Sequence, residues 1–405
     1  MNTIKVVDAR MGRGKSTAAI HYINAHKKNT RFLYITPFLS EVARFREKCG
    51  LEEPVKQGED DTKLAELRKL VHQGKSISTT HSLYQLIDDE LLEMIRDKQY
   101  TLIIDESIAA IEKAQITNQD RVILDGITTT DSDGIVSWID PDYTGKFDGY
   151  KKMADQRTLY WVDGTLINTF NKNLLDAFED VFILTYLFRG STLEAYFQCF
   201  DIPYEIWGIT GEGATCVFTP GPDQPPPIDY RPLIHIIDKR RMNEVGDPYY
   251  ALAKNWYQQR SYHDPDMIQL RKNMQNFFKN TTGSNKDNRV WTCFKDHMQK
   301  LIPDNGSYAN NFLQMVARAT NEFSGRSNLA YMVNRFEDPN LLKFFSMRDC
   351  DINRDQCALS DMLQWIWRSS IRDGKPINLY MPSRRMRDLL TTWMNQMAEG
   401  GVANA

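Results

Sequence analysis

Short apolar runs alternate with amphipathic stretches through the first third of the chain, and no other feature limits the fold as much. Runs of this length fit buried strands, and the stretches between them place apolar residues on one face of a helix. Strands that alternate with helices form a parallel sheet covered by helices. The apolar runs are residues 4–7, 32–35, 77–79 and 102–104, and the amphipathic stretches are residues 16–26, 39–49 and 83–95.

The alternation is interrupted and later returns, which indicates two α/β lobes. Residues 114–157 are rich in Thr, Asp and Gly and are predicted to be a surface insertion, and the prolines of residues 220–227 indicate an exposed connection. We predict a first lobe over residues 1–190, a linker or accessory region over 191–285 and a second lobe over 286–405. Further strands are predicted at residues 159–162, 181–186, 290–294, 329–333 and 377–380, with 181–186 closing the first sheet, and further helices at 359–371 and 384–397.

The composition excludes several classes of protein. A net charge of -3 gives no sign of a polyanion partner, so any nucleic acid would have to bind a local basic surface or groove. The six cysteines form no Cys-x-x-Cys pair, and no N-terminal apolar run precedes the first strand, so we expect a reduced, cytoplasmic setting without structural zinc. The longest apolar runs are also too short for a membrane span of about 20 residues.

Residues 9–16 read Ala-Arg-Met-Gly-Arg-Gly-Lys-Ser and follow the first predicted strand directly. They fit the P-loop pattern, with Ala9 in place of the first glycine, and a predicted helix follows. Backbone N–H groups at such a helix start can hold phosphates, Lys15 can neutralise them, and the Ser16 hydroxyl can bind Mg²⁺. A chance match in a turn is the alternative. The residues predicted to bind ATP are Met11, Gly12, Arg13, Gly14, Lys15, Ser16 and Thr17.

A second candidate element is the acidic pair Asp105-Glu106, which ends the apolar run at residues 102–104. Neighbouring residues of a strand point to opposite sides. One carboxylate can therefore bind Mg²⁺ while the next reaches the water that attacks the γ-phosphate. We assign Asp105 to the metal and Glu106 to the general base. The alternative is a helix cap followed by a first-turn carboxylate.

Short elements along the first lobe resemble, in their order, the motifs of superfamily 2 helicases. The resemblance implies that Thr36-Pro37 and Thr80-His81 lie on loops that touch the nucleic-acid backbone, and that Thr165 couples the ATP state to strand binding. Asp163-Gly164-Thr165 stands where the family has Ser-Ala-Thr. Taken singly, the Thr-Pro and Thr-His elements also fit a strand end and a helix cap. The elements are Gly14-Lys15-Ser16, Tyr34-Ile35-Thr36-Pro37, Ser78-Thr79-Thr80-His81, Asp105-Glu106-Ser107 and Val162-Asp163-Gly164-Thr165.

The second lobe resembles the later motifs of the same family. Residues 317–321, which include Thr320, resemble a loop that contacts nucleic acid, and residues 364–372 resemble the glutamine-arginine helix. Gln364, Arg368 and Arg372 are spaced by four residues, so we predict that they project from one helical face. Two guanidiniums directed at the γ-phosphate would stabilise transition-state charge, an effect of about 10³ or more in rate. A solvated basic helix face is the alternative.

The resemblance extends to helicase-like replication proteins encoded by phages of Gram-positive bacteria. It implies an α/β fold of two RecA-like P-loop NTPase domains that sandwich one ATP with Mg²⁺. The implied activity is an ATP-dependent helicase or translocase in phage replication or recombination, with nucleic acid and other replication proteins as partners. DNA is favoured over RNA because Ser107-Ile108 follow the acidic pair, and because the seven residues before Asp8 leave no room for an upstream adenine-reading element.

Other classes share part of this pattern. A packaging motor of the terminase kind would add a nuclease domain rich in metal-binding carboxylates. A small-molecule kinase would use the P-loop without a second sheeted lobe. A non-unwinding ATP-binding switch would keep the nucleotide site and lose the coupling to nucleic acid. The glutamine and arginines near the carboxyl end favour the helicase over these three.

Overall fold

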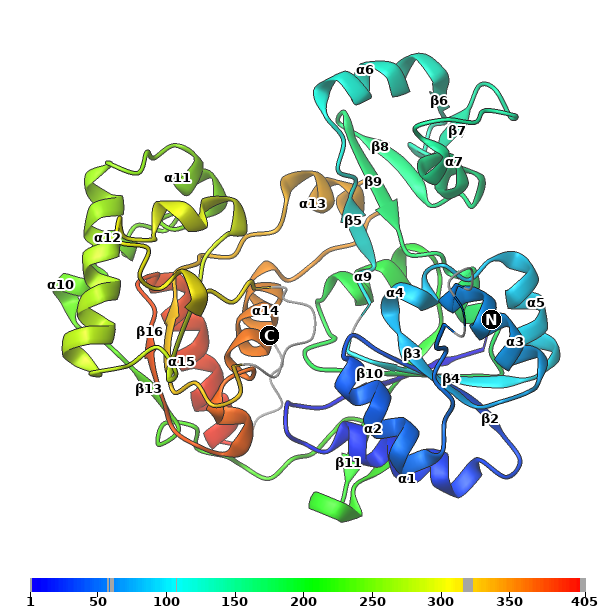
Figure 1. The fold of residues 1–405 in the computed structure, drawn as a ribbon, viewed down its shortest axis with the longest axis horizontal. Coiled ribbons are helices and arrows are strands. Elements are labelled where there is room, and N and C mark those ends of the chain that lie inside the picture. Colours follow the sequence, from blue (N-terminus) through cyan, green and yellow to red (C-terminus); the bar gives the residue numbers. More distant parts are fainter. Residues whose placement is uncertain (1, 57, 59–61, 107, 316–322, 401–405) are drawn as a thin grey trace. The chain divides into compact units, whose positions relative to one another are not determined.

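The computed structural model describes residues 2–56, 58, 62–106, 108–315 and 323–400. It has two compact units (Figure 1). Their boundaries differ from the predicted ones, because residues 191–285 are shared between the two units. Unit 1 comprises Met1–Ala9, Gly14–Pro222 and Glu337–Ile352, and unit 2 comprises Arg10–Arg13, Asp223–Phe336 and Asn353–Ala405.

Unit 1 is built on a seven-stranded sheet in which every strand pairing is parallel except that of the edge strand β12. The strands predicted in the first third of the chain are all present. The strand predicted to close the sheet, β10, instead lies between β1 and β4, and β11 and β12 extend the sheet beyond β1. The order is β12 (Val217–Pro220), β11 (Tyr204–Thr210), β1 (Ile4–Asp8), β10 (Asp180–Thr185), β4 (Tyr100–Asp105), β2 (Arg31–Thr36) and β3 (Ile77–Thr80).

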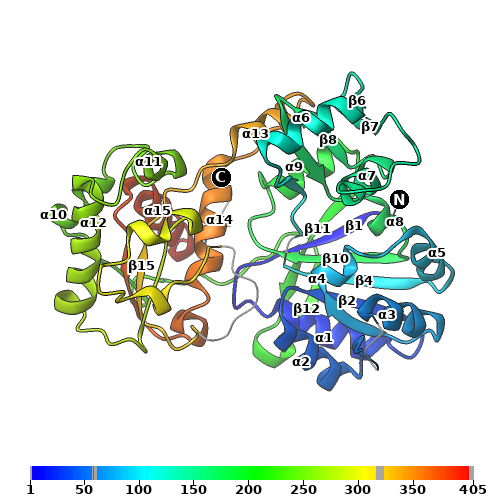
Figure 2. The ribbon, with the colours of Figure 1, turned by 45° about the horizontal axis from the view of Figure 1, so that its top comes forward.

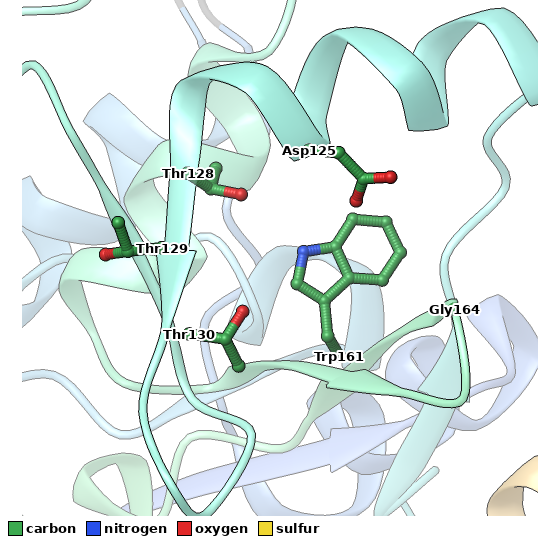
Figure 3. Close-up of a pocket in the computed structure, with 6 residues that line it drawn as sticks. All are labelled: Asp125, Thr128, Thr129, Thr130, Trp161 and Gly164. Atoms are coloured by element: carbon green, nitrogen blue, oxygen red, sulfur yellow. The ribbon is translucent and has the colours of Figure 1, made fainter.

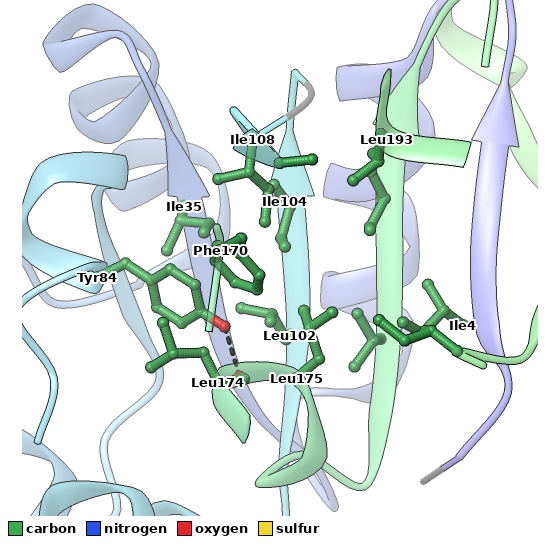
Figure 4. Packing of buried hydrophobic residues seen from close by; sticks show 14 of the residues in the cluster. Ile4, Ile35, Tyr84, Leu102, Ile104, Ile108, Phe170, Leu174, Leu175 and Leu193 are labelled. Carbon is green, nitrogen blue, oxygen red and sulfur yellow. Dashed lines mark hydrogen bonds between the residues drawn. The ribbon is translucent and has the colours of Figure 1, made fainter. Parts of the chain in front are cut away.

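The central strands pack into two cores, one on each face of the sheet. In β4, Leu102 and Ile104 belong to one core and Ile103 to the other, and all six residues of the strand are buried. A parallel sheet that is covered on both faces has such continuous apolar strands, which explains the unbroken runs in the sequence. Figure 4 shows the first core, in which the Tyr84 hydroxyl donates a hydrogen bond of 2.5 Å to the Leu174 carbonyl.

Helices cover both faces of this sheet. On one face lie α1 (Lys15–His26) and α2 (Leu39–Cys49), and on the other lie α8 (Asn173–Asp176) and α9 (Thr192–Cys199) (Figure 2). The amphipathic stretch predicted at residues 83–95 is divided between two helices, because the Asp88 side chain caps a new helix by accepting a hydrogen bond from the Leu91 N–H. These helices are α4 (His81–Tyr84) and α5 (Asp89–Asp97), and α3 (Lys63–His72) precedes them.

The predicted insertion is a separate module of unit 1 with its own small core. Leu124, Val136, Phe147 and Leu159 form part of this core. The strand predicted at residues 159–162 belongs to the module and not to the large sheet. Its elements are β5 (Ile111–Lys113), α6 (Asn118–Ile127), β6 (Thr128–Thr130), β7 (Val136–Trp138), α7 (Asp148–Asp155), β8 (Leu159–Val162) and β9 (Thr165–Thr169).

A distant segment of the chain completes unit 1. Helix α13 (Pro339–Ser346) packs beside β5 and β8 of the inserted module, where the ring of Phe344 meets that of Tyr160 edge to face at 5.1 Å. Phe344 and Phe345 are fully buried in the core of unit 1. The first unit is therefore assembled from residues that lie far apart in the sequence.

Unit 2 has a four-stranded parallel sheet, and three of its strands were predicted. The fourth, β13, lies in the region predicted to be a linker. Within the described residues of both units, no helix combines the length and apolar character that crossing a bilayer requires. The strand order is β13 (Ile234–Ile236), β16 (Ile377–Tyr380), β15 (Asn328–Tyr331) and β14 (Arg289–Thr292), and the helices are α10 (Arg240–Asn243), α11 (Lys254–Gln258), α12 (Pro265–Asn276), α14 (Arg354–Ile366) and α15 (Arg384–Ala398).

The close approach of Gly246 to Pro382 predicts a sensitive position in unit 2. A Cβ atom at Gly246 would lie 2.0 Å from the Pro382 carbonyl oxygen, which is backbone that cannot rotate away. We expect G246A to lower the free energy of unfolding by about 1–3 kcal/mol, as overpacking does. Urea titrations of G246A and of G325A check this. A Cβ at Gly325 meets no described atom within 4 Å, so equal losses in the two variants would contradict the prediction.

Candidate functional site

The loop between β1 and α1 has the backbone that the predicted phosphate cradle requires. Gly12 and Gly14 have φ angles of 74° and 95°, which residues with a Cβ rarely adopt. Gly14 is also sterically constrained, since a Cβ there would lie 2.4 Å from the sulfur of Cys216. Ala9, at the position of the missing glycine, is buried and donates its N–H to the Thr185 carbonyl at 3.1 Å.

The side chains of this loop are held in specific contacts. The Lys15 ammonium donates to the Ala9 carbonyl, so it folds back over the loop. Arg13 Nε lies 3.3 Å from Asp223 Oδ1 with both side chains buried, and Arg10 donates to the Pro226 carbonyl at 3.1 Å. The two arginines thus contact the segment after β12. Because the side chain of Arg13 is engaged there, any contact of Arg13 with phosphate would come from its backbone. Of the other predicted ligands, Met11 and Thr17 are both partly exposed.

Asp105 is the centre of the site. The hydroxyls of Ser16 and Tyr34 both donate to its Oδ2, at 3.4 Å and 2.6 Å. The ring of Tyr34 stacks on Phe45 of α2 at 3.5 Å, which fixes the direction of its hydroxyl. Burial raises the pKa of Asp105, and the hydrogen bond from Tyr34 opposes this rise. The structure therefore brings together the two residues predicted to bind a metal ion, Ser16 and Asp105.

Glu106, the predicted general base, has an unusual backbone. Its φ angle is 64°, in the left-handed region that non-glycine residues seldom occupy and that is strained outside turns. The chain therefore turns sharply at the end of β4, directly after the Asp105 carboxylate. The side chain of Glu106 is partly exposed.

The predicted Thr-Pro and Thr-His elements lie at the same edge of the sheet. Thr36 and Thr80 end the paired strands β2 and β3 and are directly opposite in register. Thr36 is fully buried, and its hydroxyl accepts a hydrogen bond from the Phe38 N–H at 3.3 Å, so it stabilises its own loop. Pro37, which follows it, is partly exposed. His81 Nε2 donates to the Asp105 carbonyl at 3.0 Å.

Thr165 lies elsewhere in unit 1. Asp163 and Gly164 have φ angles of 46° and 69° and form a two-residue hairpin turn between β8 and β9 of the inserted module. The Thr165 hydroxyl accepts a hydrogen bond of 2.8 Å from Asn340. The structure does not bring Thr165 to the sheet edge that carries Lys15 and Asp105. The Asp163-Gly164 pair forms the hairpin turn of the inserted module, and Thr165 begins the strand that follows this turn.

Sequence reasoning missed Thr185. This residue ends β10, the strand between β1 and β4, and pairs in register with Asp8 at the start of the P-loop. It is buried at the edge of the sheet where the other site residues gather. The signal was present, since ligands bind at the carboxyl ends of parallel strands and residues 181–186 were predicted to be such a strand.

The predicted helical face in unit 2 is interrupted. Helix α14 ends at Ile366, Arg368 follows it, and Arg372 lies in the 3₁₀ turn Ser370–Asp373. Gln364, Arg368 and Arg372 therefore do not share one continuous helix, and the prediction of one face is wrong. Beyond Ile366 the chain makes a contact outside the helix, where the Ser370 N–H donates to the Arg326 carbonyl at 2.9 Å in place of a helix carbonyl. Thr320 lies outside the described residues.

The fold places this chain in the α/β class, and it resembles known proteins in fold and in sequence. It is an α/β protein of two parallel-sheet units, as predicted, and over its whole length its fold is similar to that of apo XPD (12% identity, TM-score 0.51, 96% of this chain and 95% of that one). A structure of XPD helicase is similar at 13% identity and a TM-score of 0.45, over 96% of this chain and 95% of that one.

Two family models match the chain itself. Residues 228–394 match the YonV C-terminal Rossmann-like domain, and residues 111–168, the inserted module, match the YonV middle domain. The SPbeta prophage-derived uncharacterized protein YonV of Bacillus subtilis (strain 168) is 34% identical over 411 residues, which cover 97% of this chain and 99% of that protein. The chain belongs to the YonV family.

The site predicts a pH dependence of stability. Burial lowers the pKa of His81 to about 4, whereas an unfolded histidine titrates near 6.5. Between these values the unfolded chain binds a proton that the folded chain does not, so stability falls as the pH drops from about 6.5 to about 4. From pH 7 to pH 5 this contributes a loss of about 2 kcal/mol.

The variant H81Q removes this titration and is expected to lose about 2 kcal/mol less than the wild type over that pH step. Urea titrations at pH 7 and pH 5 measure the difference. H72Q, on the exposed surface of α3, is the matched control and is expected to follow the wild type. The prediction is wrong if H81Q and H72Q lose the same free energy.

Proposed function

We propose that this chain is an ATP-hydrolysing motor that acts on nucleic acid, with DNA favoured over RNA. One observation carries the proposal. At the carboxyl edge of a parallel sheet, the Ser16 hydroxyl that follows the glycine loop meets the Asp105 carboxylate at 3.4 Å. A phosphate cradle beside a hydroxyl and a carboxylate is the arrangement that holds a nucleoside triphosphate with Mg²⁺. The XPD-like fold and the prophage origin of the YonV relative support a helicase-like protein of phage replication or recombination.

The residues present fit the Mg²⁺ ion. Ser16 and Asp105 offer two oxygen ligands, and Mg²⁺ commonly takes one or two protein ligands and completes its shell with phosphate oxygens and water. When bound there, Mg²⁺ neutralises charge on the phosphates. Tyr34 positions the Asp105 carboxylate through its hydrogen bond of 2.6 Å, and we assign it that positioning role. Burial of Asp105 strengthens its attraction for a cation, because surrounding water is excluded.

The remaining steps are assigned to this chain's own groups. Lys15 leaves the Ala9 carbonyl to neutralise the β- and γ-phosphates, and the N–H groups of residues 11–17 orient them. Glu106, at the strained end of β4, orients the attacking water and accepts its proton. Thr185 takes the place of Thr165 as the residue that couples the ATP state to strand binding, because it ends the strand between the two halves of the site.

Nucleic-acid contacts are assigned to the loops that contain Pro37 and His81, and to Thr320 in the second unit. Thr36 and Thr80 hold the first two loops in register at the sheet edge. Arg368 and Arg372 are proposed to stabilise the charge that develops on the γ-phosphate, with Gln364 beside them. The resemblance to superfamily 2 helicases supports these roles.

An ATPase assay with and without single-stranded DNA tests the proposal. We expect hydrolysis that DNA stimulates, and we expect K15A to lose at least about 100-fold in kcat, since a phosphate ligand acts on transition-state charge. K28A, on an exposed lysine after α1, is the matched control and keeps the wild-type rate. ATP turnover at a rate that DNA does not change would indicate a kinase, and ATP binding without turnover would indicate a switch. Forked, 3′-tailed and 5′-tailed duplexes then separate strand displacement from translocation.

The arginine assignment has its own test. R368Q and R372Q are each compared with the wild type in kcat and in ATP affinity, measured by equilibrium binding. An arginine that stabilises the transition state is expected to lower kcat by about 10³ when it is replaced, with ATP affinity changed much less. R384Q, at the exposed start of α15, is the control. If both variants keep the wild-type kcat, neither residue is an arginine finger.

A further inference from the structure

A pocket of about 280 Å³ lies in the inserted module and is separate from the P-loop site (Figure 3). Helix α6 supplies Asp125, β6 supplies three threonines, β8 supplies Trp161, and the hairpin turn supplies Gly164. Figure 3 shows the Asp125 carboxylate directed toward the indole of Trp161. The pocket therefore combines an aromatic face, a negative charge and hydroxyl groups.

Trp161 differs from the other tryptophans of the chain. Within the described residues, each of the other seven has an aromatic ring or a cation close to its own ring, whereas Trp161 has neither. Its side chain packs against the module core on one side and is only partly buried. An indole face that the fold leaves without such a partner can attract a cation, and tryptophan does so more strongly than tyrosine or phenylalanine.

The polar side chains of the pocket can all accept hydrogen bonds. In the described part of the chain, the Asp125 carboxylate makes no hydrogen bond or ion pair and is exposed. The Thr128 hydroxyl donates to the Leu124 carbonyl at 2.8 Å, so its oxygen can still accept. An ionised carboxylate and such oxygens suit a ligand that donates hydrogen bonds. A guanidinium or an ammonium donates hydrogen bonds and is also attracted to the indole.

The surroundings favour a polypeptide that carries this cation. Residues 111–168 contain ten Asp and Glu against six Lys and Arg, so the module is acidic. Val122 lies one turn before Asp125 on α6 and is 72% exposed, and Ile139 is 60% exposed. Val122 therefore offers an apolar contact near the pocket to the residues that flank a bound cation.

We propose that this pocket binds the arginine or lysine side chain of a basic segment in a protein partner. The cation lies over the indole of Trp161, its N–H groups donate to Asp125 and to the hydroxyls of Thr128 and Thr130, which face the indole in Figure 3, and the flanking residues of the segment contact Val122. The proposal does not depend on ATP binding or hydrolysis.

A nucleic-acid strand is the competing ligand, because a base can also stack on an indole. The acidic module repels a phosphate backbone, which decides against it. Among the described residues, two cations lie near the hairpin turn, Arg121 and Lys343, and Lys343 is already paired with Asp163, which leaves Arg121 as the one to test for a contact with phosphate. Its guanidinium lies against Gly164, within 2.1 Å of where a Cβ would stand, and it does not line the pocket. Replacing Arg121 therefore distinguishes the two ligands.

The test measures binding of a labelled Gly-Val-Arg repeat peptide to the full-length protein by fluorescence anisotropy. D125N and W161L are each expected to weaken binding about five- to tenfold. D142N removes the same charge from an exposed aspartate outside the pocket and is expected to change binding less than about twofold. The control peptide is a Gly-Val-citrulline repeat, which lacks the positive charge. Its affinity for the wild type is expected to be as low as the affinity of the arginine peptide for W161L, or lower.

Asp125 is exposed, so D125N keeps the fold even if W161L disturbs the module core. Equal effects of D125N and D142N would show only general attraction to an acidic surface and would overturn the proposal. The proposal would also be overturned if the citrulline peptide bound as tightly as the arginine peptide. It would be overturned as well if free spermidine bound more tightly than the arginine peptide and lost this binding in W161L. Loss of single-stranded oligonucleotide binding in both W161L and R121Q would assign the pocket to nucleic acid instead.

Discussion

The buried carboxylate of Asp105 is the constraint on which the edge of the large sheet depends. A buried charge is costly unless hydrogen bonds satisfy it. Here Ser16 from α1 and Tyr34 from β2 donate to the carboxylate, and His81 from α4 donates to the carbonyl of the same residue. Because these donors come from different elements, satisfying Asp105 fixes the relative positions of the P-loop helix and the strand ends.

Much of this arrangement follows from local sequence. The strands of the first sheet were predictable because strands covered on both faces are continuously apolar, as residues 102–104 show. The P-loop was predictable because Gly12 and Gly14 permit backbone angles that other residues avoid. Ser16 and Asp105 were recognisable as partners because Ser16 follows the glycine loop at the start of a helix and Asp105 ends a strand.

The remainder depends on contacts that no local pattern encodes. Strand β13 (residues 234–236) pairs with β16, more than a hundred residues later, so a region that read as a linker belongs to a sheet. The Asp163-Gly164 pair was read as part of a motor motif because of its place in the motif order, but Asp-Gly is also a favoured sequence for a two-residue hairpin turn, which it forms here. The spacing of Arg368 and Arg372 suggested one helix, but the helix ends at Ile366, and the Ser370 N–H that follows bonds to the distant Arg326 carbonyl.

The placement of α13 in unit 1 has a consequence for synthesis on the ribosome. Phe344 and Phe345 fill the first core, yet they are translated after three strands of unit 2, β13, β14 and β15, have been made. Domains usually fold in order from the amino terminus as they emerge. Here the amino-terminal unit keeps an incomplete core until about residue 352 has left the ribosome, and by then most of the strands of unit 2 have already emerged.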